Sequence, residues 1–229
     1  KSSLLDNTLE VNFALYRTEY DNLQISQFDG TLGFNVGNAK ETLVQGVELD
    51  GRWLLMDDDA GTLTMNYAFA YLDHEFKDFK NGNCYNRQVP DGDIGPGGVQ
   101  LCDFTGKSGQ YTPEFTGTIG FDYFRAISFL GFEYFRVNLG LYHAGEQNIH
   151  PNLDPLYDVD GYTKVDARIA LEAENWSIAL FGRNLTDEKI ITYAGNVPLS
   201  GSSFGTNTFY GFVDRPATVG VQFQYNFTE

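Results

Sequence analysis

No run of about eighteen or more apolar residues occurs in this 229-residue sequence, which excludes a transmembrane helix. A transmembrane β-strand needs only about 9–11 residues of alternating character, so a membrane location stays open. The chain begins KSSLLDNTLE, without the basic and apolar regions of a signal peptide. We therefore expect either that a leader was removed or that the chain is an interior piece of a longer protein.

Positive charge is scarce. The sequence has 15 Lys and Arg residues against 31 Asp and Glu residues, a formal net charge of −16. The phosphates of nucleic acid would repel such a chain, so we expect no nucleic-acid partner. The same acidity disfavours direct adsorption to anionic lipid.

Cysteine is nearly absent, and both cysteines, Cys84 and Cys102, lie in one stretch rich in Gly, Asn and Asp. An even count inside one loop predicts a local disulfide and hence an oxidising compartment such as the periplasm or the cell exterior. The alternative is two unrelated free thiols. Nothing near them resembles a zinc site.

A catalytic constellation is also missing. His74, His143 and His150 are scattered and lack metal-ligand spacing, which favours a surface or lumen role over metal binding. Residues 91–98, DGDIGPGG, carry carboxylates that could hold calcium, but they lack the spaced ligands and distant Glu of a calcium loop. We predict no catalytic residue, no cofactor and no metal, so the chain is not expected to be an enzyme.

Strict alternation of apolar and polar residues is what the sequence does contain. It is clearest in ATVGVQFQYNF, residues 217–227, where one face is apolar and the other is small or polar. A period of two indicates a strand with unlike faces. The same alternation predicts about eight strands, at residues 9–16, 47–53, 63–71, 115–123, 135–141, 164–172, 176–181 and 217–227.

Short and long connections alternate between these strands. Short turns are expected near residues 56–61, 126–131 and 173–175, and long links at 77–112, 148–161 and 187–215, with a shorter first hairpin at 29–33. An antiparallel meander with tight turns at one end and long loops at the other is the layout of an outer-membrane barrel.

A soluble β-sandwich would also alternate apolar and polar residues. Three features count against it: many strands of about ten residues, where about five or six are usual, a polar face that mixes small residues with both signs of charge, and aromatic residues near strand ends. We therefore interpret the apolar faces as lipid-facing.

Four segments carry a family resemblance. Residues 35–51, NVGNAKETLVQGVELDG, place Asn35, Gly37, Ala39, Gly46 and Glu48 where one receptor family has them. In residues 176–193 an N-L-x-D signature of that family falls on Asn184, Leu185 and Asp187. Residues 215–227 are similar to the closing strand of the family. The opening stretch is similar to one of its strands that starts on a short turn. The chain resembles the C-terminal part of the β-barrel of TonB-dependent outer-membrane receptors.

This resemblance implies an all-β fold: an antiparallel transmembrane β-barrel meander, about eight strands of a larger barrel of twenty-two, with residues 1–229 as one C-terminal portion and without the plug domain. It implies active uptake of a scarce nutrient (siderophore-bound iron, cobalamin, a saccharide or an aromatic compound) across the outer membrane of a Gram-negative cell. The alternative is a small closed outer-membrane barrel acting as a structural anchor or adhesin. An outer-membrane enzyme would need a Ser/His/Asp set on one rim, which the sequence does not offer.

The resemblance also implies partners and sites. The partners are outer-membrane lipid and lipopolysaccharide, the remaining receptor polypeptide, TonB, the barrel-assembly machinery and an extracellular small-molecule ligand. Divalent cations could bridge the acidic surface of the protein to lipopolysaccharide. The closing strand resembles the signal read by the assembly machinery, at Thr218, Gly220, Phe223, Tyr225 and Phe227. Because binding groups sit on loops held by a rigid scaffold, the loops supply the candidate ligand residues. These are Tyr85, Arg87, Asp91, Asp93, Tyr193, Phe204, Phe209 and Tyr210.

Overall fold

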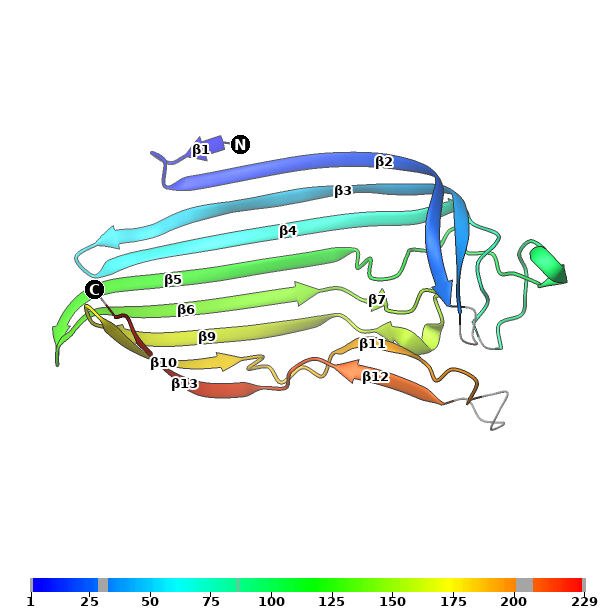
Figure 1. Ribbon diagram of the computed structural model, residues 1–229. Coiled ribbons are helices and arrows are strands. Elements are labelled where there is room, and N and C mark those ends of the chain that lie inside the picture. Colours follow the sequence, from blue (N-terminus) through cyan, green and yellow to red (C-terminus); the bar gives the residue numbers. More distant parts are fainter. Residues whose placement is uncertain (1, 29–32, 86, 201–207, 228–229) are drawn as a thin grey trace.

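The computed structural model describes residues 2–28, 33–85, 87–200 and 208–227. Their main element is a single antiparallel sheet (Figure 1), which confirms the predicted all-β fold. Its nine strands, in spatial order, are β1 (Ser2–Leu4), β2 (Leu9–Phe28), β3 (Phe34–Asp58), β4 (Gly61–Asp78), β5 (Phe115–Phe129), β6 (Phe132–Ala144), β9 (Tyr162–Glu172), β10 (Trp176–Arg183) and β13 (Thr218–Tyr225). Seven of them contain predicted strands, and β13 lies within the eighth, predicted at 217–227; the ninth, β1, is short.

Neighbours in the sheet follow the order of the chain, so the predicted meander is confirmed. The β3–β4, β5–β6 and β9–β10 connections are tight turns at one end, here called the turn end (Figure 1). Leu130 and Gly131, both with positive φ, form the turn between β5 and β6. The long connections lie at the opposite end, the loop end.

The long connections contain small elements of their own. Two short strand pairs are β7 (Gln147–Asn148) with β8 (Asp158–Val159), and β11 (Ile191–Asn196) with β12 (Phe209–Val213). Two 3₁₀ turns are η1 (Pro96–Gly98) and η2 (Pro155–Tyr157). No helix in the described residues is long and apolar enough to cross a membrane.

The apolar face of the sheet is uncovered. Val221 and Phe223 of β13 keep 69% and 65% of their surface exposed, and Leu15 of β2 keeps 69%. Apolar side chains that alternate along a strand and meet no second protein layer are suited to hydrocarbon. The sandwich alternative, in which such faces would stack against one another, is therefore wrong for the described residues.

The opposite face is polar and holds pairs of amides and carboxylates across neighbouring strands. Asn12 of β2 donates to Asp50 of β3 at 2.8 Å, and Asn138 of β6 donates to Asp122 of β5 at 2.6 Å. Such pairs satisfy polar groups on a wall that faces a wet interior. The sheet thus has the two unlike surfaces of a barrel wall.

The sheet is open. β1 and β13 lie at its two edges and do not pair with each other. A row of unpaired backbone groups is prohibitive in hydrocarbon, so both edges need partner strands. The described residues do not form a small closed barrel.

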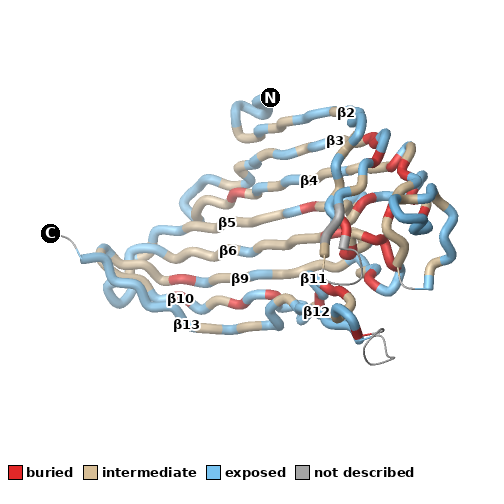
Figure 2. The backbone as a smooth tube through the Cα atoms, turned by 45° about the vertical axis from the view of Figure 1, so that its right-hand side comes forward, coloured by how far each residue is buried: buried red, intermediate tan, exposed pale blue. Residues whose placement is uncertain are grey.

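At the loop end β2 and β3 run on beyond the expected strands and bend across the ends of their neighbours (Figure 1). The bend falls at Asn22, which has a φ of 55° and is skipped in the register between Asp21↔Glu41 and Leu23↔Ala39. Asn tolerates this left-handed conformation better than most residues. We call residues 22–40 the bent hairpin; its predicted tip, 29–33, lies largely outside the described residues. Most buried residues gather at this end, as Figure 2 shows.

The lipid-facing side of the closing strand generates the first prediction. Replacing both Phe223 and Tyr225 with Asp should abolish membrane assembly of the natural protein, because each carboxylate on the apolar face costs roughly 1–3 kcal/mol in hydrocarbon. The measurement is heat-modifiable mobility of membrane fractions on gels.

The matched control replaces Gln222 and Gln224, on the opposite face of the same strand, with Asp. This variant should assemble. Normal assembly of the Phe223→Asp/Tyr225→Asp protein would contradict the assignment of the apolar face.

Candidate functional site

A hydrophobic cluster joins the bent hairpin to the first long connection, residues 79–114, here called the disulfide loop. Phe76 and Phe79 lie with ring centroids 4.9 Å apart, and Phe79 and Phe104 lie 5.4 Å apart. The buried members of this first cluster are Ala39, Phe76, Phe79, Cys102, Phe104 and Leu153. Cys84 and Cys102 form the predicted disulfide, with their Cα atoms 5.1 Å apart, and so close the loop over this cluster.

The connection between β6 and β9, residues 145–161, is the β6–β9 loop. Its Leu153 belongs to the first cluster. Its Ile149 and Tyr157 pack against Ala194 of β11 in a second cluster. This loop therefore joins the disulfide loop to the β11–β12 hairpin, residues 191–213.

Hydrogen bonds reinforce the same junction. Gln110 Nε2 donates to the carbonyl of Ile149 at 3.1 Å, and Tyr111 donates its backbone N–H to the carbonyl of Asn148 at 2.9 Å. The hydroxyl of Tyr111 reaches the carbonyl of Thr192 at 3.1 Å. The bent hairpin and the three long connections thus interlock as one unit, which we call the loop cap.

His150 lies in the loop cap and is only 4% exposed, so the surface or lumen role expected from the sequence is wrong for this residue. Its ring stacks on Tyr157 with centroids 4.7 Å apart, and its Nδ1 accepts the backbone N–H of Asn152 at 3.2 Å. Burial lowers the pKa of His150, while Asp154 opposes that shift. Tyr157 donates its hydroxyl to Asn196 at 2.8 Å, and burial raises the pKa of Tyr157 to about 12.

A cavity of about 840 Å³ opens on the polar face next to the loop cap. Tyr142 of β6, with Tyr162 and Lys164 of β9, lines it together with Asp214, which precedes β13. Lys164 Nζ donates to Asp214 at 2.8 Å and lies 5.7 Å from the centroid of the Tyr142 ring. This hydrogen bond is the main cause that lowers the pKa of Asp214. The cavity therefore offers aromatic faces, phenol hydroxyls and one ion pair.

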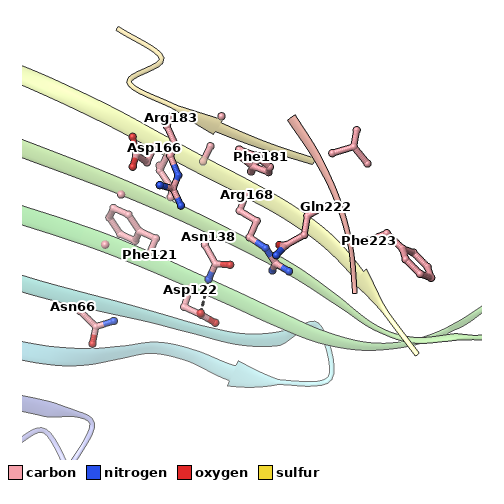
Figure 3. Close-up of a pocket in the computed structure, with 16 residues that line it drawn as sticks. Asn66, Phe121, Asp122, Asn138, Asp166, Arg168, Phe181, Arg183, Gln222 and Phe223 are labelled. Atoms are coloured by element: carbon pink, nitrogen blue, oxygen red, sulfur yellow. Dashed lines mark hydrogen bonds between the residues drawn. The ribbon is translucent and has the colours of Figure 1, made fainter. Parts of the chain in front are cut away.

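A second cavity, of about 790 Å³, continues along the polar face toward the turn end (Figure 3). Asp122, Asn138, Asp166, Arg168, Arg183 and Gln222 are among the residues that line it. The two cavities share Asn66, Gly120, Gly140 and Asp166. Together they form one polar channel wall that leads away from the loop cap. In the described residues, no group of three or more His, Cys, Asp or Glu side chains is arranged to hold a metal ion.

The sequence pattern of a family described as "TonB dependent receptor-like, beta-barrel" matches residues 1–185. That match covers well over half of the chain. The protein belongs to the TonB-dependent receptor family and forms part of its β-barrel.

Solved structures of similar fold agree. The ferric yersiniabactin uptake receptor FyuA from Yersinia pestis shares 15% identity with a TM-score of 0.66, over 96% of this chain and 28% of its own. The siderophore receptor PiuA from Acinetobacter baumannii shares 21% identity with a TM-score of 0.62, over 96% and 26%. The ferric citrate transporter FecA, in its unliganded form, shares 17% identity with a TM-score of 0.59, over 97% and 29%.

At these identities the likeness shows the fold alone. The chain spans under a third of the length of these solved receptors. Its family and its structural relatives are transport receptors and not enzymes.

In this receptor barrel the predicted ligand residues of the disulfide loop line neither cavity. Asp91 accepts the backbone N–H of Asp103 at 2.9 Å, Tyr85 donates its own N–H to the side chain of Gln88 at 3.1 Å, and Arg87 and Asp93 are exposed. Asp91 and the backbone of Tyr85 thus help to hold the loop in shape. Their role in ligand binding stays a prediction.

The candidates of the last loop lie on the β11–β12 hairpin. Tyr193 and Tyr210 share one face of this hairpin, with their ring centroids 6.0 Å apart. Phe209 lies on the other face, and its ring centroid is 6.2 Å from that of Tyr157. Phe204 lies outside the described residues. None of the three described candidates lines a cavity, so their binding role also stays a prediction.

Sequence reasoning did not find Tyr142, Tyr162 and Asp214. Tyr142 continues the alternation of Arg136, Asn138 and Gly140 on the polar face, so its orientation was predictable. Its closeness to Tyr162 was not, because it depends on the pairing of β6 with β9 across the β6–β9 loop.

The hydrogen bonds of Asn184 give a physical reason for the N-L-x-D motif of this receptor family. The residue is buried with a φ of 49°, and its Nδ2 donates to the carbonyls of Glu188 and Arg215 at 2.9 and 3.0 Å. Its Oδ1 accepts the N–H of Glu188 at 3.0 Å. Asp187, also with positive φ, accepts the N–H of Ala217 at 3.0 Å. The motif therefore ties the end of β10 to the start of β13.

Asn184→Ala should destabilise this junction by roughly 2–4 kcal/mol, because it removes several buried hydrogen bonds and leaves Ala in a left-handed conformation. Amide hydrogen exchange of residues 184–190 and 214–218 should become faster. Asn175→Ala is the control, since the Asn175 side chain makes no hydrogen bond among the described residues. Unchanged exchange in the Asn184 variant would contradict the structural role of the motif.

Acidification should loosen the β6–β9 loop. The fold favours neutral His150, so its lowered pKa makes the loop less stable as pH falls below the ordinary histidine value of about 6.5. Protonation would also set an Nδ1–H against the N–H of Asn152. The protection of residues 148–157, corrected for intrinsic exchange rates, should therefore decline as the pH falls below about 6.5.

His150→Asn retains an acceptor near the position of Nδ1 and should remove this pH dependence, whereas His143→Asn should leave it intact. If the hydrogen-exchange protection of the unsubstituted loop does not change with pH, the prediction is contradicted.

Proposed function

We propose that this chain is part of an outer-membrane receptor that captures an iron-bound siderophore at its extracellular loops and imports it with energy supplied through TonB. The family supports uptake of an external nutrient. The solved relatives include a receptor for ferric yersiniabactin, a siderophore receptor and a transporter for ferric citrate. The residues that couple energy are not expected in this portion of the barrel, so TonB is a partner of the whole receptor.

One observation carries the proposal: a cavity with aromatic, hydroxyl and charged groups lies on the polar wall directly beside an interlocked loop cap. The cap can hold a ligand outside, while the channel wall leads toward the turn end, which would face the periplasm. Tyr142 and Tyr162 offer flat faces for an aromatic or chelate group. Lys164 and Asp214 offer one donor and one acceptor group at the same edge.

The remaining partners follow from a membrane location. The apolar face would contact outer-membrane lipid, the acidic rim would meet lipopolysaccharide through divalent cations, and β13 would pair with the barrel-assembly machinery during insertion. A structural anchor or adhesin built as a small closed barrel gains no support, because β1 and β13 are not paired.

Uptake competition tests the proposal. Cells that carry the natural full-length receptor should accumulate radiolabelled iron from at least one siderophore, and cells that lack the receptor or TonB should not. Cobalamin and sugars serve as competing cargoes. Equal iron uptake with and without the receptor, for every siderophore tried, would contradict the proposal.

Lys164→Ala and Asp214→Ala should each weaken binding of the accepted siderophore by roughly tenfold or more, because each leaves a charged partner unpaired at the cavity edge. Lys40→Ala is the matched control: Lys40 pairs with Asp78 at 3.6 Å on the bent hairpin and does not line the cavity. Full affinity in both cavity variants would exclude this cavity as the binding site.

A further inference from the structure

The cavity next to the loop cap has an unequal balance of charge. Among the described residues that line it, Lys164 is the only lysine or arginine, whereas Asp50, Asp166 and Asp214 supply three carboxylates. Lys164 Nζ donates to Asp214 at 2.8 Å, so this pair is neutral as a whole. Asp50 and Asp166 form no ion pair with a described residue. The cavity therefore holds two negative charges that no cation of its own lining cancels.

Neutral donors hold these two carboxylates in place. Asn12 of β2 donates its side-chain amide to Asp50 at 2.8 Å, and Asn184 donates its backbone N–H to Asp166 at 2.8 Å. Such donors fix the position of a carboxylate without cancelling its charge. Asp50 belongs to β3 and Asp166 to β9, with β4, β5 and β6 between them in the sheet. The two charges therefore stand at opposite sides of the cavity.

The free arginines of the polar wall lie farther from the loop cap. Arg168 and Arg183 line the second cavity and not this one, and Figure 3 shows their side chains there. A group that enters from the loop end thus meets the acidic cavity before it meets the arginines.

The aromatic lining of the cavity also favours positive charge. Tyr142 and Tyr162 lie with their ring centroids 6.0 Å apart, and Lys164 Nζ is 5.7 Å from the centroid of the Tyr142 ring. The face of an aromatic ring attracts a cation through its quadrupole. The low-dielectric walls of a cleft focus the field of fixed charges within it. Two uncompensated carboxylates and two ring faces therefore give this cavity a negative potential.

We propose that Asp50 and Asp166 act as a charge filter, so that the cavity next to the loop cap admits a neutral or positively charged cargo and disfavours an anionic one. The inference rests on the proposed function, since it names the class of siderophore complex that this site takes.

The chemistry of the chelating groups decides which complexes pass such a filter. Three hydroxamate groups cancel the charge of ferric iron, and a free amine elsewhere on the molecule makes the complex positive. Three catecholate groups leave the complex strongly negative, and it would be repelled by the two aspartates. The filter therefore favours ferric tris-hydroxamates over ferric tris-catecholates.

The first test measures the potential of the cavity without any cargo. The natural full-length receptor, purified in detergent, carries Thr118→Cys, at an exposed position of β5 that lines the cavity. Cys84 and Cys102 are joined in a disulfide, and the receptor without the substitution gives the background. A positively and a negatively charged thiosulfonate are compared, each relative to its rate with mercaptoethanol. The positive reagent should react roughly fivefold faster or more, because the cavity attracts it.

Replacing both Asp50 and Asp166 with Asn should bring the ratio of the two rates close to one, because Asn keeps an acceptor for each donor and removes the charge. Asp50→Glu keeps the charge and should keep the ratio. Asp73→Asn is the matched control, since Asp73 also accepts an amide, from Gln45 at 2.8 Å, but lines neither cavity. Heat-modifiable mobility confirms that each variant is folded.

The second test uses three forms of one ferric tris-hydroxamate that share the same chelate: one with a free amine, one with this amine acetylated and one with it succinylated. These forms are positive, neutral and negative. Their binding to the purified receptor is measured by equilibrium dialysis with radiolabelled iron, beside that of a ferric tris-catecholate. The first two forms should bind roughly tenfold more tightly than the succinylated form and the tris-catecholate, and the double Asn variant should narrow this gap.

Four results would overturn the proposal: equal rates of the two thiosulfonates at position 118, no reaction with either reagent, a ratio that the double Asn substitution does not alter, or tighter binding of the tris-catecholate than of the free-amine tris-hydroxamate. Failure of the proposed function has a different signature. In that case no siderophore is imported or bound, while the two thiosulfonates still react at different rates.

Discussion

The uncovered apolar face of a single-layered sheet is the constraint on which the rest of this structure depends. The sheet is a single layer, and in the described residues Val221 and Phe223 keep most of their surface exposed. In water such a surface would be a liability, and in lipid it is the stable arrangement. In lipid every backbone group of the wall must be paired, which explains the long ladders and the need for partner strands at both edges.

Because the wall buries little of its own surface, packing is concentrated at the loop end. Two small clusters, one under the disulfide and one beside Tyr157, supply the packed interior of the described residues. The β6–β9 loop contributes to both, through Leu153 and Ile149. The long connections are therefore joined to one another through packed side chains.

The polar wall contains both carboxylates that accept hydrogen bonds and arginines with few partners. Amides pair with Asp50 and Asp122 and hold the strands together across the wet face. Arg168 lies 3.9 Å from the carboxylate of Glu172, and the Arg183 side chain makes no hydrogen bond or ion pair with a described residue.

The sequence by itself determined the strands, their unlike faces, the alternation of short and long connections, and the disulfide. These features depend on the period of two, on turn residues and on closeness along the chain. Only the tertiary structure decided the cavity residues: Tyr142, Lys164 and Asp214 come from three segments that meet through strand pairing, and no local pattern records which distant strands pair. The sequence likewise did not predict the bend at Asn22 or the packing of His150, because both depend on contacts with segments that are far away in the chain.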